Sequence, residues 1–280
     1  MKGDLPMKNF ITSMELKESF DQFIVLDCRY DLSDPSYGHR SYLKSHIKNS
    51  HFFDLEKDLS RAVEKHGGRH PLPFLADFIN KLENTGISND SKIVVYDDDM
   101  FVAPRLWWML KYIGIEDVKV LDGGFKSWNY EELIESEHNT KKLNLGKIYA
   151  QINQSMVVNI EEVKKMIDEP NEYSMLVDSR TNERYKGIVE PIDKIPGRIP
   201  TSLNIFYNDA YLDGYLKSRE ELESLYSKIM PYKEIVVYCG SGVTAPANII
   251  AMDEIGILTR LYVGSYSDYI SYEENEVEVG

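Results

Sequence analysis

The second half of this chain repeats the order of motifs found in its first half. Residues 91–115 (SKIVVYDDDMFVAPRLWWMLKYIGI) align with residues 233–257 (KEIVVYCGSGVTAPANIIAMDEIGI). Both segments read as an apolar strand, a short loop, Ala-Pro, an apolar helix and Gly-Ile. Three further pairs follow in the same order: FIVLDCRY with SMLVDSRT, SHIKNSHFF with GRIPTSLNI, and VLDGGFKSW with LYVGSYSDY. Matches that keep one order along the chain indicate a tandem duplication.

Each half alternates apolar strands with helices. The continuous apolar runs IVVY and EIVVY, each followed by a helical pattern, are typical of parallel strands buried on both faces. We therefore predict the α/β class, with two tandem domains that each hold a parallel sheet flanked by helices on both faces. The expected domains are 1–135 and 155–280, joined by a polar, weakly patterned linker at 136–154. A chain of 280 residues with 42% hydrophobic composition can fill two such cores.

The net charge of −14 argues against nucleic acid or an anionic membrane as a partner, because both would repel an acidic surface. The two cysteines, Cys28 and Cys239, make no disulfide framework, which suits a reducing compartment. The first ten residues, MKGDLPMKNF, lack the apolar core of a signal peptide, and no apolar run approaches membrane-spanning length. We therefore expect a cytoplasmic protein that binds neither nucleic acid nor membrane.

Cys239 stands at the end of a predicted strand, where ligands collect in parallel α/β sheets. Gly240 and Gly242 allow successive backbone N–H groups to turn inward as an anion nest. A helix that begins near Pro246 would add its partial positive charge at the same place. Together these features should lower the thiol pKa, so we predict a reactive cysteine. The alternative is a small buried hydrophobic residue, as free cysteines often are.

The first half has Asp97 where the second half has Cys239, and its loop reads DDDMFV. Three acidic side chains, Asp97 to Asp99, are expected to form neither an anion nest nor a nucleophile. A metal site is one interpretation, but no histidine or further carboxylate pattern completes it nearby. We therefore interpret the segment as a solvated, degenerate copy of the catalytic loop.

With these motifs, the chain resembles the tandem-domain rhodanese-like sulfurtransferases over nearly its full length. The resemblance rests on CGSGVTA, DSRTNERYKGIVEPID, GGRHPLP, YDDDMFVAPRLWWML and LDGGFKSW. The cysteine loop looks like that of 3-mercaptopyruvate sulfurtransferases, whereas thiosulfate-preferring rhodaneses usually carry basic residues where Gly240 and Ser241 stand. The resemblance implies a non-catalytic first domain and a catalytic second domain. It also implies sulfur transfer through a persulfide on Cys239, with no metal or organic cofactor.

The resemblance further implies that Arg184, in NERYKG, binds the substrate. Mercaptopyruvate and thiosulfate are both anions, and a guanidinium recognises such groups by paired hydrogen bonds. The alternative for Arg184 is a surface salt bridge to Glu183 or Glu190, which would contribute little. The loop residues expected beside it in the substrate site are Gly240, Gly242, Val243 and Thr244.

The chain departs from the family pattern at two basic positions. Arg198 stands where the family commonly has the histidine of GHIPG, and either adds a positive charge to the substrate site or is simply exposed. The family's EPEPR arginine is missing, and Lys194 of EPIDK is its nearest substitute. Either Arg198 or Lys194 could replace this missing arginine. Arg180 is different, because Arg29 occupies the same place in the first half; we predict a structural role for both.

His70, in GGRHPLP, matches a histidine that family mechanisms place at the domain interface with an acidic residue and the loop serine, here Ser241. Glu56 is the nearest match to that acid, with Asp58 as the alternative. Such a set could deprotonate a substrate thiol or stabilise charge during transfer. His66 and His70 also invite a zinc interpretation, but no cysteine stands near them, so we predict no metal site.

For two further side chains, those of Arg105 and Cys28, the predictions are less specific. Arg105 lies at the start of the helix after the degenerate loop, and the sequence leaves open whether its side chain faces the cleft. Cys28 ends a buried strand and is expected to belong to the core rather than to act as a resolving thiol.

The predicted activity is transfer of sulfane sulfur from 3-mercaptopyruvate or thiosulfate to cyanide or a thiol, including a protein thiol such as that of thioredoxin. A non-catalytic persulfide carrier or redox-sensing module that acts with a partner protein is the alternative. A cysteine phosphatase is a poor fit, because Ala245 stands where those loops need an arginine. The preferred donor, the acceptor and the oligomeric state stay open.

Overall fold

The computed structural model describes residues 7–137 and 144–280. Residues 138–143 of the predicted linker and residues 1–6 of the segment searched for a signal peptide lie outside the described residues. Within the described part of the chain, each half contains a parallel sheet of five strands. Of the described part of the predicted linker, residues 144–154 run along the first half, where Ile148 is buried and Gly146 donates a backbone hydrogen bond to Glu83.

The two sheets have the same strand order, which confirms the duplication. The first sheet contains, from edge to edge, β1 (Phe10–Ile11), β6 (Val118–Leu121), β5 (Lys92–Tyr96), β2 (Phe23–Asp27) and β4 (His51–Phe52). The second contains β8 (Val157–Val158), β14 (Arg260–Tyr262), β13 (Glu234–Tyr238), β9 (Ser174–Asp178) and β10 (Leu203–Asn204). Every neighbouring pair in both sheets is parallel. The predicted α/β fold is therefore confirmed.

The central strands β5 and β13 are apolar on both faces because helices or the other half cover each side. Four of the five residues of each strand are buried. The register pairs Asp27 with Tyr96 in the first sheet and Asp178 with Tyr238 in the second. The loop that follows each tyrosine therefore emerges at an equivalent edge of its sheet.

The helices alternate with the strands along the chain. In the first half they are α1 (Ser13–Glu18), α2 (Tyr37–Lys44), α3 (Leu75–Asn84) and α4 (Ala103–Tyr112). In the second they are α5 (Ile160–Asp168), α6 (Asn182–Tyr185), α7 (Arg219–Tyr226), α8 (Ala245–Glu254) and α9 (Ser265–Tyr269). Helices α4 and α8 each have a proline in the first turn, where the missing N–H costs no hydrogen bond.

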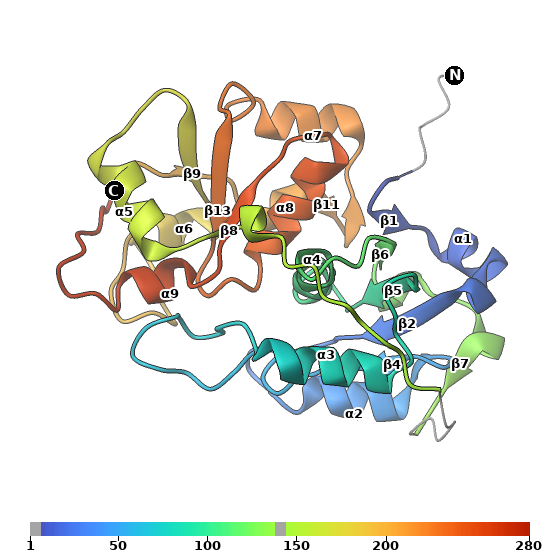
Figure 1. The fold of residues 1–280 in the computed structure, drawn as a ribbon. Coiled ribbons are helices and arrows are strands. Elements are labelled where there is room, and N and C mark those ends of the chain that lie inside the picture. The colour runs from blue at the N-terminus through green and yellow to red at the C-terminus, as the bar shows by residue number, and fades with distance from the viewer. Residues whose placement is uncertain (1–6, 138–143) are drawn as a thin grey trace.

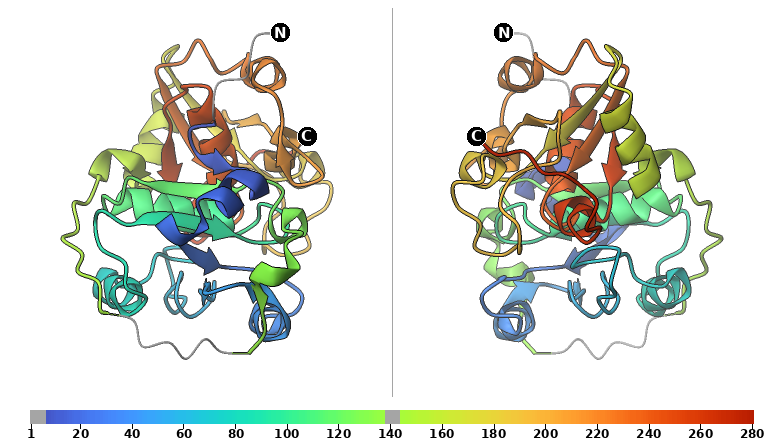
Figure 2. Two further views of the ribbon diagram at one scale, coloured as in Figure 1. Left: turned by 90° about the vertical axis from the view of Figure 1, so that its right-hand side faces the viewer. Right: turned by 90° about the vertical axis from the view of Figure 1, so that its left-hand side faces the viewer.

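Helices α4 and α8 pack against each other between the two sheets. One buried apolar cluster extends across this contact, from Leu106 and Trp107 on α4 to Ile249 and Ile250 on α8. Smaller clusters line the outer face of each sheet. Both views in Figure 2 keep the orange elements of the second half above the cyan helices of the first. The two halves therefore share a core, and side chains at the start of α4 can reach the second half.

An aspartate–arginine pair stands at the same place in both halves. Arg29 Nη2 lies 2.6 Å from Asp27 Oδ2, and Arg180 Nη2 lies 2.7 Å from Asp178 Oδ2. All four side chains are buried, and each guanidinium also donates to a backbone carbonyl. This arrangement agrees with the structural role predicted for both arginines, since removing one partner would leave a buried charge unpaired.

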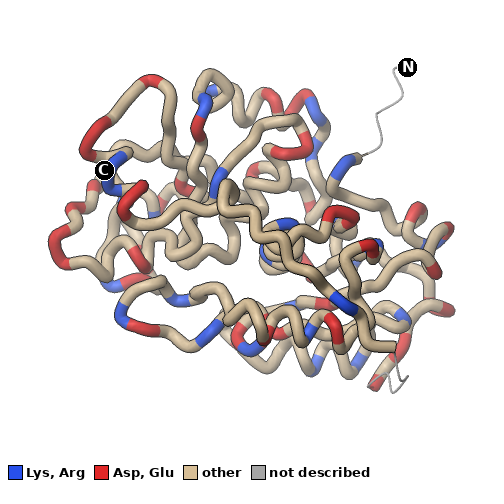
Figure 3. The backbone as a smooth tube through the Cα atoms, viewed as in Figure 1, with Lys and Arg blue, Asp and Glu red and all other residues tan. Residues whose placement is uncertain are grey.

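Figure 3 shows acidic and basic residues interspersed along the backbone of both halves. None of the helices described is long and apolar enough to cross a membrane.

Candidate active site

Cys239 directly follows β13, and the loop after it closes around the sulfur. The backbone N–H of Gly242 donates to Cys239 Sγ at 3.1 Å, and the N–H of Cys239 donates to Ser265 Oγ at 3.1 Å. Gly242 has φ of +75°, and a Cβ there would lie 2.2 Å from the carbonyl oxygen of Val263. No side chain fits in that space, so this turn requires glycine. The predicted inward-facing loop is present.

Burial by itself would raise the pKa of the Cys239 thiol, but hydrogen bonds to the sulfur outweigh it and lower the pKa from its ordinary value. The strongest comes from the Thr244 side chain, followed by the backbone amides of Ala245, Ser241 and Thr244. These donors stabilise the anion, as expected at the start of a helix. The lowered thiol pKa agrees with a reactive cysteine rather than an inert core residue.

The segment before α3 brings first-half side chains to this loop. In Figure 1 it is the cyan loop that lies beside the red helix α9. The N–H of Arg69 donates to Ser267 Oγ at 3.1 Å. Gly68, with φ of +79°, approaches so closely that a Cβ would lie 2.4 Å from the carbonyl oxygen of Gly264. This contact places His70 against the cysteine loop.

Ser241, His70 and Glu56 form a chain of contacts across the two halves. His70 Nδ1 lies 2.8 Å from Ser241 Oγ, and His70 Nε2 lies 3.2 Å from Glu56 Oε1. Asp58, the alternative acid, instead contacts the N–H of Asp54. Burial, followed by the positive charge of Arg105, lowers the pKa of His70 to about 4. The imidazole is therefore neutral at pH 7, so Nε2–H can donate to Glu56 while Nδ1 accepts from the serine.

Arg184 and Arg69 approach the cysteine loop from opposite halves and share one carboxylate. Arg184 Nη2 lies 2.8 Å from Asp193 Oδ2, and Arg69 Nη1 contacts Asp193 Oδ1. A Cβ on Gly240 would lie 3.0 Å from Arg69 Nη2 and 3.4 Å from Arg184 Nη2. Arg184 also pairs with Glu190, the alternative partner, but both residues are largely buried, so this is no surface salt bridge.

The contacts of Arg198 lie at the C-terminal segment rather than at the cysteine loop. Arg198 Nη2 lies 3.1 Å from Glu278 Oε2, its Nη1 donates to the Gly280 carbonyl, and its guanidinium stacks over Tyr185. These contacts use Arg198 to hold the C-terminal segment, which corrects the expectation that it adds charge to the substrate site. Lys194 is exposed.

The remaining loop residues are divided between the sulfur and the core. Thr244 caps α8 and contributes its side chain to the sulfur, whereas the Val243 side chain is buried in the apolar core. Only the backbone of Val243 is therefore available to a ligand. Gly240 leaves the space beside the two arginines free of a side chain.

The degenerate loop of the first half differs from its prediction. Asp97 is 2% exposed rather than solvated. Its two carboxylate oxygens accept backbone hydrogen bonds of 2.6–3.2 Å from Asp99, Met100, Val102 and Ala103. The loop thus does form an anion nest, and the carboxylate of Asp97 occupies it. The prediction was wrong because it treated three adjacent acids alike, although only the first turns inward.

His66 and Cys28 have structural surroundings. His66 Nδ1 lies 2.7 Å from Ser271 Oγ, and its ring stacks on Tyr272. Cys28 is fully buried and donates to the Tyr96 carbonyl, as expected of a core residue, and burial raises its pKa. In residues 7–137 and 144–280, no three His, Cys, Asp or Glu side chains are grouped as a metal ion requires.

Three residues at the site were missed by sequence reasoning: Arg69, Asp193 and Ser265. Arg69 directly precedes His70, so its position beside a predicted site residue was an available signal. Asp193 and Ser265 offered none, because their contacts depend on how distant segments fold together.

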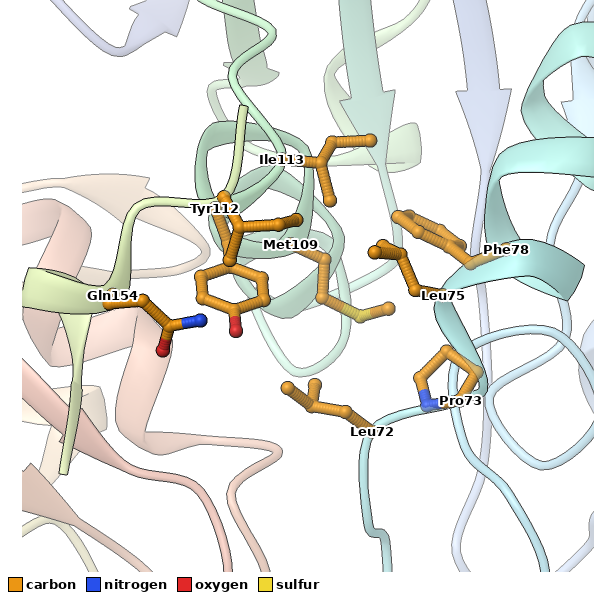
Figure 4. A pocket seen from close by; sticks show the side chains of 9 residues that line it. Leu72, Pro73, Leu75, Phe78, Met109, Tyr112, Ile113 and Gln154 are labelled. Atoms are coloured by element: carbon orange, nitrogen blue, oxygen red, sulfur yellow. The ribbon is translucent and has the colours of Figure 1, made fainter. Parts of the chain in front are cut away.

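An apolar cavity of about 270 Å³ lies away from this loop. Figure 4 shows Met109 of α4 and Ile113, which directly follows α4, between two groups of side chains. Tyr112 and Gln154 lie on one side, and Leu72, Pro73, Leu75 and Phe78 on the other. Its lining includes no residue of the cysteine loop.

Comparison with known proteins gives consistent matches. The rhodanese-like domain family matches twice, at residues 12–131 and 159–272. A probable 3-mercaptopyruvate sulfurtransferase of Pseudomonas aeruginosa is 39% identical over 92% of both chains. The thiosulfate sulfurtransferase of Bos taurus is 34% identical over 79% of this chain and 75% of its own.

The fold is matched as well. The solved structure of SseA from Escherichia coli, described as a 3-mercaptopyruvate sulfotransferase with the rhodanese fold, superposes with a TM-score of 0.79. It is 30% identical, and the match covers 92% of this chain and 98% of that one. This chain therefore belongs to the family of sulfurtransferases built from two rhodanese-like domains.

Proposed function

We propose that the protein transfers sulfane sulfur from 3-mercaptopyruvate or thiosulfate to cyanide or a thiol through a persulfide on Cys239. The observation that carries the proposal is the position of the Cys239 sulfur in a ring of hydrogen-bond donors, with two arginines beside the adjacent Gly240. A thiolate is the nucleophile that sulfur transfer requires, and cationic side chains attract anionic donors. The first half is non-catalytic because Asp97 fills its own loop.

With mercaptopyruvate, the Cys239 thiolate attacks the donor sulfur. A new S–S bond forms as the donor C–S bond breaks, and the electron pair of that bond leaves on the carbon as the enolate of pyruvate. The proton of the donor thiol ends on this enolate, so the products are pyruvate and the anionic persulfide. A cyanide or thiol acceptor then attacks the outer sulfur and restores the Cys239 thiolate. With thiosulfate, the leaving group is sulfite and no proton is transferred.

Ser241, His70 and Glu56 supply the route for that proton. Nδ1 of the neutral His70 accepts from the Ser241 hydroxyl, while Nε2–H faces Glu56. The serine can therefore take the donor's thiol proton as it passes its own proton to His70, and return it to the enolate. The loop amides and the Thr244 hydroxyl then stabilise the terminal sulfur of the persulfide.

The proposal is tested by incubating the purified protein with each donor and cyanide, and following thiocyanate. We expect sustained turnover with at least one donor and, without acceptor, a mass increase of one sulfur on the Cys239 peptide. Sustained turnover without a partner protein would also exclude the carrier or redox-module alternative. No turnover with either donor would contradict the proposed enzyme, and persulfide loading without turnover would favour the carrier.

The Asp193→Asn variant is expected to raise KM for mercaptopyruvate about tenfold and leave kcat nearly unchanged. The Asp193 side chain is buried and holds the guanidiniums of Arg69 and Arg184 together beside Gly240. Without the carboxylate, the two guanidiniums lose the anchor that prepares them for the donor's own carboxylate. The measurement is steady-state pyruvate formation at varied donor concentration.

The matched control is Asp168→Asn, the same change at an exposed side chain that ends α5, and we expect no change in the KM of this variant. A lower KM in Asp193→Asn would mean that Asp193 competes with the donor for the arginines, contrary to the proposed role.

A further inference from the structure

Arg105 is a buried charge whose counter-ion is not an ordinary carboxylate. Its side chain is 1% exposed, and its Nε is buried without a hydrogen-bond partner. In the part of the chain that the structure describes, Arg105 forms no salt bridge with an acidic side chain. Burying a guanidinium is expensive unless another charge or enough acceptors compensate it. Backbone carbonyls accept hydrogen bonds from Arg105, but neutral acceptors do not balance its charge. The charges that hold the pKa of Arg105 up against burial are Cys239, followed by Glu56.

The contacts of Arg105 lead to the cysteine loop. Its Nη1 donates to the carbonyl oxygen of Gly242 at 2.8 Å. Its Nη2 donates to the carbonyls of Leu59 and His70, both at 2.9 Å. Gly242 is also the residue whose N–H donates to Cys239 Sγ. The guanidinium and the sulfur are thus connected through one loop residue, and the same guanidinium holds the backbone of His70.

We propose that Arg105 is a positioning residue of the non-catalytic half whose buried charge keeps the Cys239 sulfur ionised. Its hydrogen bond to the Gly242 carbonyl fixes the loop residue that donates to the sulfur, and its charge attracts the thiolate through a medium that screens poorly. This inference rests on the proposed function, in which the Cys239 thiolate is the nucleophile.

The repeat supports this assignment. Arg105 lies in the first turn of α4, and the equivalent residue in the first turn of α8 is Ala247. A cation is disfavoured there, because the start of a helix carries partial positive charge. Among the described residues, the Arg105 side chain forms no hydrogen bond with the first half's own loop, whose nest Asp97 fills. The side chain instead crosses to the loop of the other half, where the anion would form.

Other titratable groups near Cys239 do not supply the same charge. Arg69 is paired with Asp193 and partly exposed, and His70 is neutral because burial and Arg105 lower its pKa to about 4. Tyr207 also lies near the sulfur, where a phenolate would repel it, but burial raises the pKa of Tyr207 so that it stays neutral. Burial lowers the pKa of Arg105 itself to about 10, which still leaves the guanidinium charged at pH 7.

The test compares Arg105→Gln, which keeps a donor without charge, with Arg105→Lys, which keeps charge with fewer donors. The rate of iodoacetamide alkylation of the Cys239 peptide is measured by mass spectrometry from pH 5 to pH 10. We expect the midpoint of the rate profile to rise by about one pH unit or more in Arg105→Gln, and by less than half as much in Arg105→Lys. Arg219→Gln, on the exposed side of α7, is the matched control and should not move it.

A structural role alone would shift both Arg105 variants equally, or shift neither, and either result would overturn the inference. Thermal unfolding of each variant identifies any variant that has lost its fold. The rate profiles are compared only for variants whose melting temperature matches that of wild type. Failure of the inference is distinguishable from failure of the proposed function, because wild-type persulfide formation and thiocyanate turnover do not depend on these variants.

Discussion

The Cys239→Ser variant is expected to form no persulfide and to lose more than about 10³-fold of thiocyanate turnover with either donor. A serine oxygen cannot carry a sulfane sulfur, and its hydroxyl ionises at far higher pH than the thiol, whose pKa the loop donors lower. The loop itself should persist, because Gly242 can donate to an oxygen as it does to sulfur. The measurements are thiocyanate formation and the intact mass after incubation with donor alone.

Cys28→Ser is the matched control, because it removes the other thiol of the chain. Cys28 is fully buried and donates to the Tyr96 carbonyl, a bond that a serine hydroxyl can also make. Turnover should therefore remain close to that of wild type. A persulfide on the Cys239→Ser protein, or loss of turnover only in Cys28→Ser, would mean that Cys28 carries the transferred sulfur and would contradict the proposal.

The fold was predictable because its evidence is local and occurs twice. Apolar runs of strand length such as Ile93–Tyr96 indicate strands buried on both faces, and the matching run before Cys239 carries the same signal. A duplication then requires the same strand order in both halves, as found. The cysteine loop was predictable for a similar reason, since its glycines and the following proline have direct backbone consequences.

The contacts between the halves were only partly predictable. The resemblance indicated that His70 would meet Ser241, but nothing in the residues themselves places Asp193 between Arg69 and Arg184. That bridge depends on the close approach of Gly68 to α9, which is a property of the folded chain. Arg198 failed as a candidate for the same reason, because its partners lie at the C-terminus.

The loop at Asp97 was misjudged because composition alone does not say which way a side chain faces. Asp98 and Asp99 are at least partly exposed, as a run of acids predicts. Asp97 instead follows a buried strand, and the backbone turns its N–H groups toward the carboxylate. The two loops are therefore built alike: one holds a resident anion, and the other leaves its donors to a sulfur.

The Asp97→Ala variant is expected to lower the free energy of unfolding by about 3 kcal/mol, because four backbone amides lose their acceptor. Chemical unfolding measures this loss. Asp98→Asn is the control, since Asp98 accepts only from the hydroxyl of Tyr37 among the hydrogen bonds described, and its change should stay within about 0.5 kcal/mol. Equal stability of the two variants would show that the resident carboxylate does not organise the loop.

The same variant has a signature in its pH dependence. Burial raises the pKa of Asp97 from 3.8 to about 6, although the amides oppose it. Between these two values the folded state binds more protons than the unfolded state, so the Asp97 contribution to stability falls as pH rises through this window. The stability difference between wild type and Asp97→Ala should therefore be larger at pH 5 than at pH 7. A difference that instead grew with pH would mean that the nest binds the carboxylate more strongly than burial penalises it, and the same reasoning would then predict a still more acidic thiol at Cys239.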